Sequence, residues 1–218
     1  MEAFIDIAGT ALRYAGYVGL LLLLLPIVVL IAPKPLAGAA KVVSGALDRV
    51  SGAAMSFSVA AAFLIILIQL SAVLLRYVFG LSFSWLNDSV IFSFAMIFML
   101  GAAATLRDDG HVRVDIMRSR FGPRTRASIE LFGAMAFIFP IGILILYAGA
   151  GLITRTWLDL EPFNESDGLP IKYLFKTLVP LFAVLMMGQG LSQALKSALI
   201  IRELTSADET EHAHGGSV

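Results

Sequence analysis

Five long apolar stretches constrain this chain more than any other feature of its sequence. None of them contains a charged residue, and they are Tyr14–Ala32, Val50–Leu75, Ser89–Leu106, Leu131–Thr154 and Thr177–Leu195. A helix needs about 20 apolar residues to cross the hydrocarbon core of a bilayer. Charged residues make up only 15% of the chain, whereas a water-soluble domain carries about 25%. The sequence therefore predicts an integral membrane protein with about five transmembrane spans.

These stretches have the composition of helices and not of barrel strands. They are rich in Leu, Ile, Ala, Phe and Val, without the alternation of polar and apolar residues that barrel strands show. In lipid, a helix satisfies its backbone N–H and C=O groups within one segment. The predicted fold class is therefore an all-α integral membrane protein. Pro26, Pro140 and Pro180 lie within or near the ends of these stretches, where each predicts a kink or a helix start.

The arginines of the connection between the third and fourth spans predict the orientation. They are Arg107, Arg113, Arg118, Arg120, Arg124 and Arg126. Lys and Arg concentrate in short loops on the cytoplasmic side of a membrane, so we place this connection there. The five from Arg113 onward are expected to set the topology and to bind lipid headgroups. Alternation over five spans then puts the N-terminus in the periplasm and the C-terminus in the cytoplasm.

Two segments outside the spans are too polar to cross the membrane. Residues 33–49 carry Lys41 and Arg49 among Val and Leu, which fits an amphipathic helix lying on the membrane surface; a plain short loop is the alternative. Residues 203–218 are polar and acidic, and we predict a disordered tail because they offer too few apolar side chains to pack.

The spans lack the residues that cofactor binding and ion transport use. No His lies in any of them, which excludes a haem held by paired histidines. Asp, Glu, Lys and Arg are absent from their middles, so we expect no ion path within this chain. We expect no catalytic residues, no cofactor and no metal, and the zero net charge gives no reason to expect nucleic-acid binding. Gln69, Gln189 and Gln193 are expected to join helices by hydrogen bonds.

An ordered set of residues around the third span carries a family resemblance. The set is Arg76, Tyr77 and Phe79 at the end of the second span, Trp85 in the turn, Gly101 at the close of the third span, and Arg107, His111 and Asp115 after it. This pattern resembles the small membrane subunit of TRAP transporters, the tripartite ATP-independent periplasmic systems (DctQ-type family). Asn87 and Asp88 stand where that family has two glutamates.

The resemblance covers residues 47–202, which hold a four-helix core. Residues 1–46, with the first span and the linker, resemble the longer branch of the family. The resemblance implies a non-catalytic scaffold subunit of a sodium-coupled secondary transporter in the bacterial inner membrane. Its implied partners are a large membrane subunit, which carries a solute that is usually an organic acid, and a periplasmic solute-binding protein. The alternatives are an autonomous small carrier or channel, and the membrane anchor of an enzyme complex.

Eight residues are candidates for functional contacts. Arg76, Tyr77, Trp85 and Asp88 lie at the predicted outer interface, where they either contact another subunit or anchor the helix ends among the headgroups. We also expect Asp88 to pair with Arg76. Small residues beginning at Gly101 allow helices to approach closely. Arg107, His111 and Asp115 are expected to have a structural role as loop residues that satisfy the end of a helix; the alternative is that Asp115 holds Arg107 or His111 to fix the cytoplasmic turn.

Overall fold

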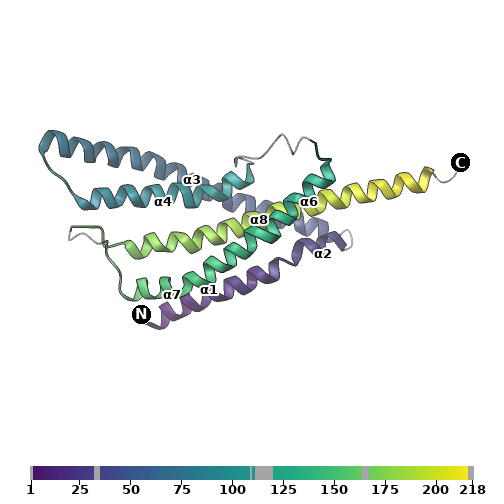
Figure 1. Ribbon diagram of the computed structural model, residues 1–218, viewed down its shortest axis with the longest axis horizontal. Helices are drawn as coiled ribbons and strands as arrows, with labels where there is room; N and C mark the ends of the chain where they lie inside the picture. The colour runs from purple at the N-terminus through teal and green to yellow at the C-terminus, as the bar shows by residue number, and fades with distance from the viewer. Residues whose placement is uncertain (1, 32–34, 109, 111–119, 164–166, 216–218) are drawn as a thin grey trace.

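The protein is all-helical over the residues that the computed structural model describes, namely 2–31, 35–108, 110, 120–163 and 167–215. Figure 1 shows the helices lying side by side along one long axis. Five helical runs are long and apolar enough to cross a membrane. The predicted fold class is therefore confirmed. These runs are Gly9–Ile31, Leu36–Phe79, Ser84–Arg107, Pro123–Leu158 and Lys172–Ser206.

Seven α-helices and one π-helical turn make up these described ranges. They are α1 (Glu2–Leu22), α2 (Leu25–Ile31), α3 (Pro35–Phe79), α4 (Ser84–Arg107), α6 (Pro123–Gly133), η1 (Ala134–Ile138), α7 (Phe139–Leu158) and α8 (Lys172–Gly215). Helix α8 is the most buried of the spans and α3 the least. Figure 1 shows α8 in the middle, with α3 and α4 as a hairpin on one side and α7 and α1 on the other.

The direction of the chain reverses from each of the five membrane-length runs to the next, so the bundle has two distinct ends (Figure 1). We call one the acidic-loop end; it holds the N-terminus, the connection from α3 to α4 and the connection from α7 to α8. The other is the arginine end, where α2, α4 and α8 finish and α6 begins. Each candidate residue that the structure describes lies at or toward one of these two ends.

The linker after the first span does not form a separate surface helix. It is the beginning of α3, which runs without interruption for 45 residues. At 1.5 Å per residue this helix is about 68 Å long, more than twice the thickness of the hydrocarbon core. Pro35 stands at its first position, where proline is well tolerated because no N–H is needed. Helix α8 likewise continues through Gly215, past residue 203, after which we predicted a disordered tail.

The three prolines lie at different places in their helices. Pro26 is the second residue of α2, and the break before it at Leu23 and Leu24 avoids the clash of its ring with a carbonyl of the preceding turn. Pro140 is the second residue of α7, directly after the π-helical turn of η1. Pro180 lies inside α8 and begins no helix. The prediction at Pro26 is thus confirmed as a helix start, whereas at Pro140 the helical backbone continues through the π-helical turn.

Close contact between α3 and α4 depends on a glycine. Gly101 is buried against Ser58 of α3, whose Oγ donates to the Ile97 carbonyl at 2.8 Å. A Cβ at position 101 would lie 2.9 Å from that Oγ, closer than side-chain atoms normally pack. The neighbour that approaches Gly101 is therefore another helix of this same chain.

Candidate functional site

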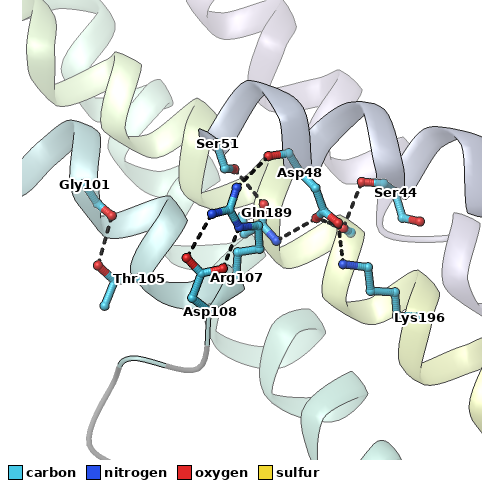
Figure 2. A network of polar contacts seen from close by, with 10 residues as sticks. Ser44, Asp48, Ser51, Gly101, Thr105, Arg107, Asp108, Gln189 and Lys196 are labelled. Carbon is cyan, nitrogen blue, oxygen red and sulfur yellow. Dashed lines mark hydrogen bonds and ion pairs between the residues drawn. The ribbon is translucent and has the colours of Figure 1, made fainter. Parts of the chain in front are cut away.

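A network of polar side chains joins α3, α4 and α8 where α4 ends (Figure 2). Its centre is Asp48 of α3. The Oδ2 atom of Asp48 accepts from Lys196 Nζ at 2.6 Å, and Oδ1 accepts from Ser192 Oγ at 2.7 Å and Gln189 Nε2 at 3.1 Å. The three donors occupy positions i, i+3 and i+7 of α8, so they share one face of that helix. Both carboxylate oxygens are therefore used to hold α3 against α8.

Gln189 and Ser192 each make a second contact across the same helix pair. Ser51 Oγ donates to Gln189 Oε1 at 2.6 Å, and Ser192 Oγ also lies 3.2 Å from the Ser44 carbonyl. Ser44, Ser51, Gln189 and Ser192 are all buried. Buried polar groups are costly when they lack partners and stabilising when they are satisfied. Gln189 thus joins two helices, as expected from the sequence.

Arg107 attaches the end of α4 to this network. Its Nη1 donates to the Asp48 carbonyl at 3.0 Å, and its Nε and Nη2 donate to the two oxygens of Asp108 at 2.7 and 2.9 Å (Figure 2). The fork of the guanidinium matches a carboxylate in this two-point geometry. The Arg107 hydrogen bonds lower the pKa of Asp108 below its usual value. Arg107 therefore ties the end of α4 to α3, whereas its expected partner Asp115, like the candidate His111, lies outside the described residues.

Asp88 fastens α4 to the connection before α8 at the acidic-loop end. It is buried, and its Oδ2 accepts from the backbone N–H of Leu169 at 3.0 Å. In the same connection Asp167 Oδ2 accepts from the backbone N–H of Ser84 at 3.0 Å, which lowers the pKa of Asp167. The expected pair between Asp88 and Arg76 is absent from the described residues; Asp88 Oδ2 instead accepts from the Leu169 N–H, and Arg76 donates to Ser82.

Glu161 forms a second cluster in that connection. Its Oε1 lies 2.8 Å from Lys172 Nζ and its Oε2 lies 2.5 Å from Lys176 Nζ. Hydrogen bonds from Lys172, which has the larger effect, and from Lys176 lower the pKa of Glu161 to about 2. Beside it, Trp157 Nε1 donates to Thr177 Oγ1 at 2.9 Å, which joins α7 to α8. This cluster fixes the loop between these two helices.

The remaining candidates at the acidic-loop end are exposed. Arg76 Nη2 donates to Ser82 Oγ at 3.3 Å. The Tyr77 and Trp85 side chains are 81% and 42% exposed, and the ring of Trp85 lies beside that of Phe83, with 6.1 Å between their centroids. The structure thus separates Asp88, which braces the bundle, from Arg76, Tyr77 and Trp85, which face outward.

The described part of the arginine-rich connection lies at the opposite end. Arg120 is exposed, Arg126 Nε donates to the Phe121 carbonyl at 2.8 Å, and Arg124 Nη2 donates to Thr205 Oγ1 of α8 at 2.9 Å. Arg113 and Arg118 lie outside the described residues. Within the described part, these arginines share one end of the bundle, as headgroup contacts would require.

The Asp48 network could not be assembled from the sequence. Asp48 and Lys196 each lie just outside a predicted span and are 148 residues apart. The detectable signal was local: Gln189, Ser192 and Lys196 recur at helical spacing on one face of an otherwise apolar segment. Among the side chains that the structure describes, no three His, Asp or Glu residues gather into a group that could hold a metal.

The fold and its polar sites together define a class of protein. It is a multi-pass membrane protein whose interior polar side chains join its own helices. The chain belongs to the DctQ family, the DctQ component of the tripartite ATP-independent periplasmic transporters, whose family model matches residues 65–199. This confirms the family resemblance, and a transporter component of this kind is not an enzyme. Searches of curated proteins and of solved structures return no match.

Proposed function

We propose that this chain is a small scaffold subunit of a TRAP transporter, packed against a large membrane subunit that carries the solute. Family membership supports the transporter class. The proposed driving force is a sodium gradient and the proposed solute is an organic acid, as is usual for such systems. A periplasmic solute-binding protein would deliver the solute to the assembled complex, and anionic lipids would contact the arginines.

The Asp48 network is the observation that carries the scaffold proposal. Its carboxylate is fully used by Gln189, Ser192 and Lys196. A carboxylate that carries an ion or a proton must exchange partners during transport, whereas this one holds two helices at a fixed crossing. The arrangement favours a rigid frame over a moving carrier. It also argues against the first alternative, an autonomous carrier or channel.

The proposed orientation places the arginine end in the cytoplasm and the acidic-loop end in the periplasm. Arg120, Arg124 and Arg126 support it because basic residues are retained on the cytoplasmic side. The acidic-loop end then carries Asp159, Glu161 and Asp167 toward the binding protein.

Purification in mild detergent from native membranes tests the proposal. An affinity-tagged chain is expected to recover one large multi-pass protein in equal amount, identified by mass spectrometry. Liposomes holding this chain alone are expected to take up no solute, while liposomes holding it with the large subunit and the binding protein accumulate solute when sodium is supplied outside. Uptake by the chain alone would refute the scaffold function. Recovery of a soluble enzyme in place of the membrane protein would favour the anchor alternative.

A further inference from the structure

A polar cavity of about 520 Å³ lies between α3 and α4 at the acidic-loop end. Gln69 and Arg76 line it from α3, and Asn87 and Asp88 line it from α4. This volume is within the range of sites that bind small molecules. Gln69 lies seven residues before Arg76, or about 10 Å further along the helix toward the middle of the span. The cavity therefore reaches from the level of the helix ends into the apolar layer.

The cavity is lined by one cation and one anion that are not paired with each other. Among the described residues, Arg76 makes one hydrogen bond, to Ser82 Oγ at 3.3 Å, and no ion pair. Asp88 accepts from the Leu169 N–H through Oδ2, and its Oδ1 has no partner in the described part of the chain. Charges at the edge of the hydrocarbon layer are costly unless another polar group meets them. The pair of charges therefore calls for a ligand that carries both signs.

Two uncharged amides add to this lining. Gln69 and Asn87 are exposed, and neither forms a hydrogen bond with any described residue. Gln69 stands within the charge-free stretch from Val50 to Leu75, where an unpaired amide facing lipid tails is unfavourable. Each amide can donate to a carbonyl oxygen and accept from a hydroxyl. A ligand with ester carbonyls below its charged head would satisfy them.

We propose that this cavity binds the headgroup of a zwitterionic phospholipid, with its phosphate at Arg76 and its ammonium at Asp88. Gln69 and Asn87 then meet the glycerol and ester oxygens, and the acyl chains lie along the apolar wall that includes Val73. A carboxylate from another protein would satisfy Arg76 but would place a second negative charge near Asp88. The unpaired cation and anion thus favour phosphatidylethanolamine over phosphatidylglycerol, which has a phosphate and no ammonium.

Native mass spectrometry of the full chain, with any partners that accompany it, tests this site. The complex is delipidated and then titrated with phosphatidylethanolamine or phosphatidylglycerol. We expect the wild type to retain the ethanolamine lipid preferentially, and Arg76→Gln to weaken that retention about tenfold through loss of a charge-assisted contact. Arg155→Gln is the matched control, because Arg155 is an exposed arginine in the last turn of α7 at the same end of the bundle.

Two further variants keep the test decisive if Arg76→Gln folds poorly. Gln69→Leu places an apolar side chain on an apolar helix and is expected to lower retention several-fold without loss of folding. Asp88→Asn is expected to abolish the preference between the two lipids. Equal retention by the wild type, Arg76→Gln and Gln69→Leu would overturn the proposal, as would equal affinity of the wild type for both lipids. The proposal would also be overturned if a co-purified subunit cross-linked to position 76 and the complex retained no lipid. Lipid retention and its response to these substitutions are measured without any transport assay, so the result is independent of the scaffold function.

Discussion

Replacing Asp48 by alanine removes the acceptor around which α3 and α8 are joined. Three donors lose a partner: Gln189 Nε2, Ser192 Oγ and Lys196 Nζ. Ser192 retains the Ser44 carbonyl at 3.2 Å, and Lys196, whose side chain is 45% exposed, can turn toward water or headgroups. Gln189 is buried, so its amide N–H cannot turn toward water or headgroups.

The expected loss of stability follows from the hydrogen bonds that each of these three donors loses. An unsatisfied buried donor costs about 1–3 kcal/mol, which applies to Gln189. The weaker remaining bond of Ser192 costs about 0.5–1 kcal/mol, the net value of one ordinary hydrogen bond. The partly exposed ion pair contributes about 1 kcal/mol at most. We therefore expect Asp48→Ala to lower the free energy of unfolding by about 1.5–5 kcal/mol, on these magnitudes.

Unfolding of the purified chain by SDS in mixed micelles measures this loss, with circular dichroism reporting helix content. Asp108→Ala is the control, because Asp108 is 60% exposed and pairs with Arg107 at the edge of the network; an exposed ion pair contributes little to stability, so its removal should lower the unfolding midpoint far less than Asp48→Ala does. Asp48→Asn keeps an oxygen acceptor and should fall between the wild type and Asp48→Ala. An Asp48→Ala midpoint equal to that of Asp108→Ala would refute the claim that this network holds the bundle together.

Three other predictions concern the acidic-loop cluster, helix packing and topology. Glu161 has a folded-state pKa lowered to about 2 from 4.5, so its ion pairs stabilise the loop above pH 4.5 and are lost as the pH falls toward 2; the protection of residues 159–163 against amide hydrogen exchange, relative to the intrinsic exchange rate at each pH, should fall over this window in the wild type and not in Glu161→Gln. Gly101→Ala should destabilise the α3–α4 contact by about 1–3 kcal/mol because its Cβ crowds the facing serine, whereas Gly149→Ala, which meets no atom within 4 Å, should not; equal unfolding midpoints would contradict this. The chain has no cysteine, so a membrane-impermeant maleimide should label Ser82→Cys in cells with a permeabilised outer membrane and label Gly122→Cys only after lysis of the inner membrane; the reverse pattern would invert the proposed topology.

The positions of the spans could be predicted because lipid acts on each helix separately. A stretch such as Leu131–Thr154 must be helical in hydrocarbon whatever its neighbours are, and the observed run Pro123–Leu158 contains it. Helix ends were harder to place. Pro35 and the residues up to Arg49 looked like a linker because they carry charges, yet nothing in them breaks a helix once Pro35 has begun it.

The partners in the polar contacts, unlike the spans, could not be predicted from the sequence. Arg76 and Asp88 are 12 residues apart and at the same end of two adjacent helices, and a pair between them was a reasonable expectation. The Asp88 carboxylate instead meets the N–H of Leu169, 81 residues further along the chain. A backbone N–H gives no signal in a sequence, so this partner could not have been chosen from residue types.

The sequence by itself determined that this protein is helical, that it crosses the membrane about five times and that it resembles the DctQ family, because hydrophobic length and a local motif order are properties of continuous segments. Only the tertiary structure decided which polar side chains meet. Asp48 and Lys196 are 148 residues apart, and their contact depends on the crossing of α3 over α8. That crossing is set by the packing of many small contacts along both helices, which no single segment encodes.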